Sequence, residues 1–125
     1  SVLSSLLVPQ EFALEALLHD AAEAYLQDIP APLKHLLPDY CAMEIRVDSA
    51  IRQKFGLPAE QHPTVKYADL VMLASERRDF EIDDGTVWPM LEGIIPTDQF
   101  VINPVRPGQA YGMFMNRFHQ LMERR

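Results

Sequence analysis

The chain has 125 residues, of which 48% are hydrophobic and 23% are charged, a balance typical of one soluble globular domain. Its 18 acidic residues outnumber 11 basic ones, and this net charge of −7 argues against long nucleic acid as a partner. No apolar run approaches the ~20 residues of a membrane span, and no leader-like segment opens the chain. The single Cys41 excludes an internal disulfide and a cysteine-rich zinc site. We therefore expect a cytoplasmic protein without a membrane partner.

The first third of the chain is rich in Ala and Leu, which favours helices. Residues 1–7 are typical of the end of a helix. The segment Glu11–Tyr25 has no Gly, Pro or β-branched residue, and Pro9 stands before it, where a helix can begin. Because its apolar residues lie on nearly every side, we expect this helix to be central and buried.

Two further helices are predicted after Pro30 and Pro32, beyond one helical turn at 33–37. The first spans 39–55 and ends at Gly56, with an Asp48–Arg52 pair on its outer face and an inner stripe formed by Tyr40, Met43, Val47, Ala50, Ile51 and Phe55. The second spans 63–79, and its inner stripe comprises Val65, Ala68, Met72 and Leu73. Asp69 falls inside that stripe and Glu76 continues it.

The segment 81–108 carries several Gly and Pro residues and predicts a long irregular connection, with one helical turn at 88–91. Within it, Trp88 could stack on a nucleobase, but an anchoring role is favoured. A last helix is expected over 111–123, with an inner face formed by Phe114, Phe118, Leu121 and Met122. No alternating strand pattern is found, so the sequence predicts an all-α fold.

Charged groups stand together in the most apolar helix. His19 and Asp20 are adjacent, and Glu23 follows one turn after His19 on the same face. A charged group in a dry helix is unfavourable by several kcal/mol unless it is paired or binds a metal. A divalent ion held by His19, Asp20 and the distant Asp69 would satisfy all three. The simpler alternative is a buried histidine that only hydrogen-bonds a carbonyl and Asp20.

Two segments carry a family resemblance. HDAAEAYLQDIPAPLK at 19–34 and VKYADLVMLASERRD at 65–79 resemble the HD-domain metal-dependent phosphohydrolases. The resemblance extends to the YGMF segment at 111–114 and is strongest to the prophage-encoded YfdR-type proteins, relatives of the bacterial 5′-deoxyribonucleotidases. It implies a helical bundle and one divalent metal ion (Mn, Co, Zn, Fe, Ni or Mg). The implied reaction releases phosphate from deoxynucleoside or nucleoside 5′-monophosphates.

The resemblance also implies roles for individual residues. His19 and Asp20 match the doublet that ligates the metal, and Asp69 matches the distal Asp ligand. Glu23 matches an acid that works beside the metal in catalysis, and Asp28 matches a second acid important for activity. Lys34 stands where the relatives keep a basic residue that could meet substrate phosphate, although a surface lysine is the plainer interpretation.

One departure concerns a further His ligand, which the family places about one helix before the doublet. The chain begins at Ser1 without it, so we expect 1–125 to be a single, N-terminally shortened HD-type domain. A homodimer and the roles of Glu76, Arg77 and Arg78 stay open. The alternative hypothesis is a non-enzymatic HD-like prophage protein that binds a host protein through the acidic segment 81–84 and the long connection.

Overall fold

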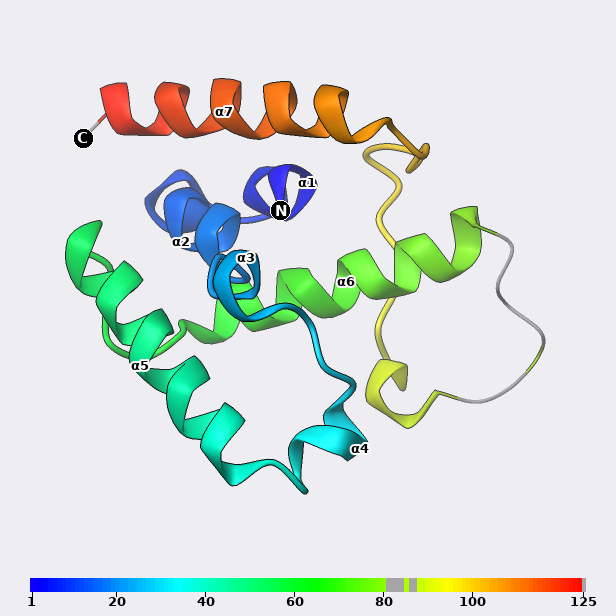
Figure 1. The fold of residues 1–125 in the computed structure, drawn as a ribbon. Helices are drawn as coiled ribbons and strands as arrows, with labels where there is room; N and C mark the ends of the chain where they lie inside the picture. Colours follow the sequence, from blue (N-terminus) through cyan, green and yellow to red (C-terminus); the bar gives the residue numbers. More distant parts are fainter. Residues whose placement is uncertain (81–84, 86–87, 125) are drawn as a thin grey trace.

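The computed structural model describes residues 1–80, 85 and 88–124, and within these residues the fold contains helices and no strand (Figure 1). The predicted all-α class is confirmed. The elements in chain order are α1 (Val2–Leu6), the 3-10 turn η1 (Gln10–Phe12), α2 (Ala13–Leu18), α3 (Glu23–Leu26), α4 (Ala31–Lys34), α5 (Pro38–Lys54), α6 (Pro63–Asp79), the 3-10 turn η2 (Pro89–Leu91) and α7 (Pro107–Glu123). The acidic segment 81–84 of the binding hypothesis lies outside the described residues.

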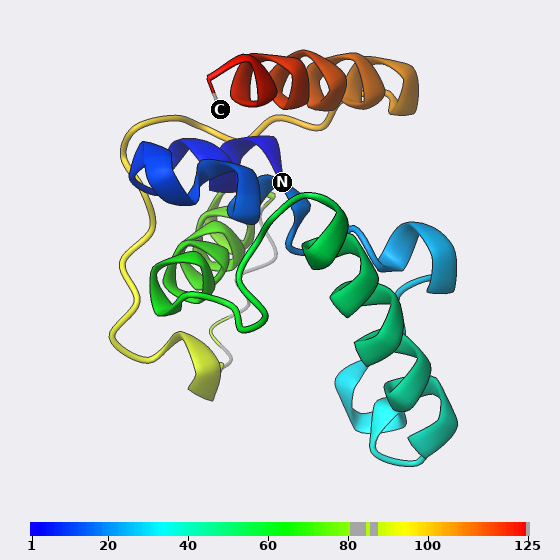
Figure 2. The ribbon, with the colours of Figure 1, turned by 90° about the vertical axis from the view of Figure 1, so that its left-hand side faces the viewer.

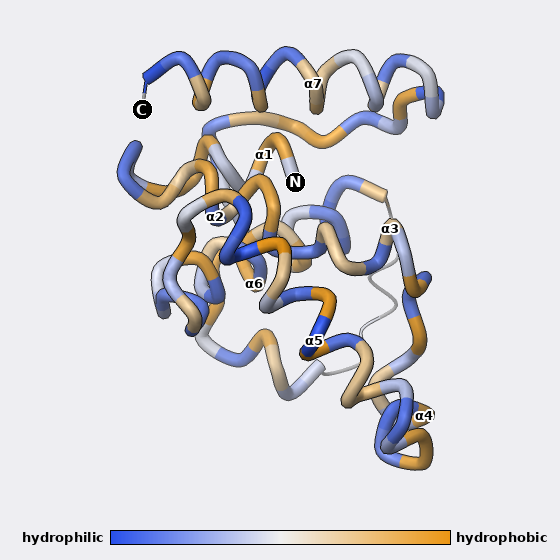
Figure 3. The backbone as a smooth tube through the Cα atoms, turned by 60° about the vertical axis from the view of Figure 1, so that its left-hand side comes forward, coloured by the Kyte–Doolittle hydropathy of each residue, from blue (hydrophilic) through white to orange (hydrophobic). Residues whose placement is uncertain are grey.

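Helix α2 is the centre of the fold, as its apolar surface predicts. All six of its residues are buried, and it contacts α1, α6 and α7 (Figure 1). The main apolar cluster joins α2 to α7 and comprises Ala13, Leu14, Leu17, Leu18 and Leu121. In Figure 3 the hydrophobic turns of α7 lie on its side toward α1 and α2. Met122 is more exposed than its predicted inward position implies.

The prediction of one continuous helix over Glu11–Tyr25 is wrong. The structure divides this segment into η1, α2, a run of turns at 19–22 and α3. In the turns, the Ala21 amide donates to the Leu18 carbonyl at 3.0 Å and the Glu23 amide to the Asp20 carbonyl at 3.0 Å, the tighter spacing of a 3-10 turn. The helix is therefore interrupted at the charged doublet, His19 and Asp20. The helical propensity of the flanking residues did not predict this interruption.

Helix α5 has the predicted length but not the predicted burial. Together with α4 it projects away from the other helices (Figures 1 and 2). Met43 is 44% exposed and Ala50 is also exposed, whereas Phe55 at the end of α5 packs against the main cluster. The predicted inner stripe is therefore only partly correct, because only the C-terminal end of α5 reaches the core.

A buried ion pair joins α2 to α5. Arg52 is 6% exposed and Glu15 is 3% exposed, and Arg52 Nη1 donates to Glu15 Oε1 at 3.1 Å. The predicted pair of Arg52 with Asp48 is present at 3.0 Å. Its placement on the outer face of the helix is wrong, because Arg52 turns inward to meet Glu15. Helical periodicity alone places a polar residue such as Arg52 on the solvent side, because it carries no information about a buried partner on another helix.

The C-terminal half of α6 anchors the connection that follows. Ser75 Oγ accepts from the Thr97 amide at 3.0 Å, and Arg78 Nη1 donates to the Thr97 carbonyl at 2.8 Å. The Arg77 guanidinium lies 4.4 Å from the ring centre of the half-buried Trp88. Trp88 thus has the anchoring contact that the sequence favoured. The helical turn predicted at 88–91 is confirmed as η2.

Asp79 is the last residue of α6, and its side chain binds the backbone of the connection that leads to α7. Its Oδ2 accepts from the Ile102 amide at 2.8 Å, and its Oδ1 accepts from Arg78 Nε at 2.7 Å. The hydrogen bond from Arg78, followed by that from Ile102, lowers the pKa of Asp79 from 3.8 to about 2. The folded protein therefore favours the ionised carboxylate.

We expect the stabilising effect of Asp79 to depend on pH in the acid range. Because its folded-state pKa lies below that of the unfolded chain, the contribution is complete above about pH 4 and is lost as the pH falls toward 2. The difference in melting temperature between the wild type and Asp79→Asn should be larger at pH 6 than at pH 2.5. Thermal unfolding at both pH values measures it, and an equal difference at both would contradict the assignment.

Candidate metal centre

His19 lies at the centre of a cluster formed by two distant segments. It follows α2 directly, its side chain is 6% exposed, and its Nδ1 donates to the Ala16 carbonyl at 2.7 Å. That bond turns Nε2 toward two carboxylates, at 2.9 Å from Asp20 Oδ2 and 3.1 Å from Asp69 Oδ1. Asp69 comes from the predicted inner stripe of α6. The two segments that the resemblance linked therefore meet in the fold.

The three side chains have the donor atoms and spacing of a cation site. One ligand atom from each of His19, Asp20 and Asp69 lies within 4.8 Å of the other two. Imidazole and carboxylate ligands bind zinc-like ions at about 2.0–2.2 Å, so neighbouring donors around one ion lie roughly 3.0–3.5 Å apart. The Nε2-to-oxygen distances of 2.9 and 3.1 Å are close to that separation and are also ordinary hydrogen-bond distances. The donor set of His19, Asp20 and Asp69 is therefore one that could hold a divalent ion.

The electrostatics of the cluster favour positive charge. Burial opposes a charged His19, but hydrogen bonds to Asp20 and Asp69 outweigh it and raise the pKa of His19 to about 10. The same hydrogen bond from His19 lowers the pKa of Asp69. Both imidazole nitrogens face oxygen acceptors, so the metal-free cluster stabilises a cation between two carboxylates.

The cluster opens into an acidic cavity of about 340 Å³. It is lined by Ser1, Ser4, His19, Asp20, Glu23, Asp28, Asp69, Met72, Leu73 and Glu76. The structure thus brings together the predicted ligands and both predicted catalytic acids. Glu76 joins them, as its position two turns after Asp69 on α6 indicated, and burial raises its pKa.

Glu23 begins α3 beside the cluster. Burial, then the Asp20 and Asp28 carboxylates, raise the pKa of Glu23 above its ordinary value, while Lys34 and His19 oppose the shift. A carboxyl group whose pKa moves toward neutrality exchanges protons more readily at physiological pH. The position and environment of Glu23 therefore suit a general acid or base.

A strained turn carries Asp28 to the cavity. Gln27 ends α3 with φ 63° and ψ 168°, a left-handed conformation that non-glycine residues rarely adopt. Two hydrogen bonds hold it: the Gln27 amide donates to the Glu23 carbonyl at 2.8 Å, and Tyr40 Oη donates to the Gln27 carbonyl at 2.7 Å. The turn reverses the chain so that the exposed Asp28 lines the same cavity as Glu23.

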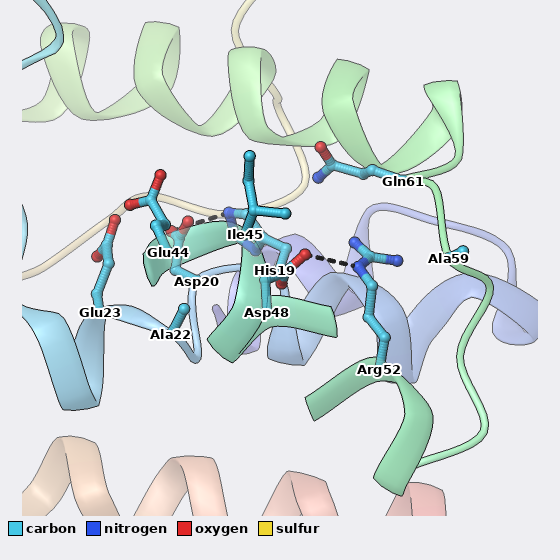
Figure 4. Close-up of a pocket in the computed structure, with 10 residues that line it drawn as sticks. All are labelled: His19, Asp20, Ala22, Glu23, Glu44, Ile45, Asp48, Arg52, Ala59 and Gln61. Carbon is cyan, nitrogen blue, oxygen red and sulfur yellow. Dashed lines mark hydrogen bonds and ion pairs between the residues drawn. The ribbon is translucent and has the colours of Figure 1, made fainter. Parts of the chain in front are cut away.

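A second pocket, of about 240 Å³, shares His19, Asp20 and Glu23 with the acidic cavity and is otherwise lined mainly by residues of α5 and of the segment before α6. Figure 4 shows the carboxylates of Glu23, Asp20 and Glu44 grouped toward one end, with Arg52 and Gln61 at the other. Glu44 and Arg52 were not predicted from the sequence as parts of this pocket. The periodicity of α5 offered no signal for them, since both are polar residues that lie outside its predicted apolar stripe.

Lys34 does not line either of these two cavities. It ends α4, and its Nζ donates to Glu44 Oε2 at 3.0 Å and lies 5.8 Å from the ring centre of Tyr40. The hydrogen bond to Glu44 raises the pKa of Lys34. Its predicted contact with substrate phosphate stays a prediction, because in this structure its charge is paired with Glu44.

The fold and the cluster define an all-helical protein with a candidate cation site between its central helix and α6. The chain is 63% identical over all 125 residues to the protein of Escherichia coli (strain K12) named "Uncharacterized protein YfdR", and it covers 70% of that protein. It therefore belongs to the YfdR family, as the resemblance predicted. No family model and no solved structure matches the chain. Among the described residues, no helix is long and apolar enough to span a bilayer.

Proposed function

We propose that this protein is a metal-dependent phosphohydrolase that releases phosphate from nucleoside or deoxynucleoside 5′-monophosphates. The observation that supports it most is the convergence of His19, Asp20 and Asp69, whose ligand atoms lie within 4.8 Å of one another although Asp69 is 49 positions after Asp20. The HD-domain resemblance of the same segments supports the reaction and the substrate class.

The charge of the cavity supports a role for a metal. Its lining includes five carboxylate residues, namely Asp20, Glu23, Asp28, Asp69 and Glu76, and no lysine or arginine. A phosphate ester is itself anionic, and the single positive charge of His19 does not offset five carboxylates, so this lining would repel the ester unless a further cation were bound there. A divalent ion would attract the phosphate, polarise a phosphoryl oxygen and make water a better nucleophile.

The residues beside the cluster would then position and transfer protons. Glu23 would accept a proton from the attacking water or donate one to the leaving oxygen, for which its raised pKa suits it. Asp28, across the same cavity, would hold a hydroxyl group of the substrate through a hydrogen bond. The Ala16 carbonyl fixes the ring of His19 so that Nε2 faces Asp20 and Asp69, the residues that would hold the ion with it.

The experiment is a phosphate-release assay with the full-length protein. Purified protein is freed of metal, supplied with Mn²⁺ or Co²⁺, and offered a panel of nucleoside and deoxynucleoside 5′-monophosphates. We expect release that depends on added metal and disappears with a chelator. If the protein holds metal but releases no phosphate from any member of the panel, the phosphohydrolase proposal is wrong and the binding hypothesis is favoured.

A further inference from the structure

Glu15 is a buried carboxylate with contacts to two other helices. Its Oε1 accepts from Arg52 Nη1 of α5 at 3.1 Å and from the backbone amide of His62, the N-cap of α6, at 3.0 Å. Arg52 is held in turn by the Pro58 carbonyl at 2.8 Å. We call Glu15, Arg52 and the His62 amide the clasp.

The clasp lies close in the chain to both halves of the metal centre. Glu15 is on α2, four residues before His19, which caps the C-terminal end of that helix, and His62 is the N-cap of α6, seven residues before Asp69. Phe12 stacks on the His62 ring at 4.0 Å between ring centres, and His62 Nδ1 accepts from the Thr64 amide at 3.1 Å. The start of α6 is therefore fixed against α2, and a shift along either helix would separate Asp69 from His19.

The buried ion pair between Glu15 and Arg52 is better suited to fixing how the helices align than to stabilising the fold. A buried ion pair gains little over apolar side chains of similar size, because removing both charges from water offsets their attraction. Setting the register between helices is a well-attested use of such groups. We propose that the clasp is the positioning element of the metal centre, holding α2 and α6 in the register that brings Asp69 to His19. This inference rests on the proposed metal site.

The test replaces the ion pair with apolar side chains. The double variant Glu15→Met/Arg52→Met removes one negative and one positive charge, so the net charge near the cluster is unchanged. We expect it to fold with a modest loss of stability, because the His62 amide and the Pro58 carbonyl lose their partners. It should bind Mn²⁺ about 10–100-fold more weakly, the loss typical when a group that supports a metal ligand is changed. Titration of Mn²⁺ into the full-length protein measures the affinity.

A second measurement needs no metal. In the metal-free wild type, the Nε2–H of His19 is hydrogen-bonded to Asp20 and Asp69, and its NMR signal should be protected from exchange with water. In the double variant that protection should be lost. If the double variant does not fold, Glu15→Gln, which keeps an acceptor oxygen but no charge, takes its place in both measurements and should show a smaller loss.

Ser75→Ala serves as the control, because it removes a buried hydrogen bond to Thr97 at the far end of α6. Ser75→Ala should lower the stability of the protein but leave both the Mn²⁺ affinity and the protection of the His19 Nε2–H signal unchanged. An unchanged His19 signal in the clasp variant overturns the inference, as does unchanged Mn²⁺ affinity where the wild type binds the ion. A wild type that binds no Mn²⁺ would overturn the proposed function, and the NMR comparison would still decide whether the clasp positions His19.

Discussion

Glu23→Gln is expected to lower metal-dependent phosphate release by about 10²–10⁴-fold, the usual contribution of a general acid or base, while the metal stays bound. Glu23 lines the cavity beside the cluster, but only His19, Asp20 and Asp69 form the group of closely spaced ligand atoms among the described residues. The glutamine keeps the size of the side chain and cannot exchange the proton. The measurement pairs a rate assay at saturating Mn²⁺ with a determination of bound metal.

Asp20→Ala is the matched comparison. Asp20 Oδ2 is 2.9 Å from His19 Nε2, so its removal should reduce metal binding and activity together. Equal loss of metal from Glu23→Gln and Asp20→Ala would identify Glu23 as a ligand. Full activity in Glu23→Gln would remove it from the mechanism.

Arg52→Met alone is expected to lower the free energy of unfolding by about 3–5 kcal/mol, because it leaves the Glu15 carboxylate buried without its partner. The largest part of the effect comes from the unpaired charge, so the further change Glu15→Met should recover part of the loss, although the His62 amide then has no acceptor. Chemical denaturation of the three proteins measures the difference.

Lys34→Met provides the control for an ion pair nearer the surface. Lys34 and Glu44 are each more than a quarter exposed, and such pairs contribute about 0–1 kcal/mol. If Arg52→Met destabilises the protein no more than Lys34→Met, the Glu15–Arg52 pair lies in a better-solvated environment than its burial indicates.

Much of the candidate site could be predicted, because each half of it is marked by charged residues within a short apolar segment of the sequence. Asp69 was expected inside an apolar stripe, and a carboxylate in such a stripe needs a partner wherever the helix packs. The HD doublet in the most apolar segment supplied that partner. The structure joins the two at 3.1 Å, which the chain separation of 50 residues between His19 and Asp69 could not show by itself.

The parts that were not predicted depend on individual hydrogen bonds that a hydrophobic pattern does not encode. At the break after Leu18, the His19 ring donates to the Ala16 carbonyl and the chain continues in 3-10 turns over 19–22, whereas the flanking Ala and Leu residues favour a continuous helix. Arg52 turns inward only because Glu15 is there to meet it. The stripe on α5 has the right period, but its N-terminal half packs against the short α4 rather than the core.

The central claim is that His19, Asp20 and Asp69 hold one divalent ion, and a Mn²⁺ titration followed by electron paramagnetic resonance tests it most directly. The wild-type full-length protein should bind one ion per chain, with the bound signal distinct from free Mn²⁺. Asp69→Asn, which keeps the shape of the side chain, should weaken binding by more than the about 10–100-fold typical of residues that only support a ligand. Absence of bound Mn²⁺ in the wild type, or equal affinity in Asp69→Asn, would contradict the account.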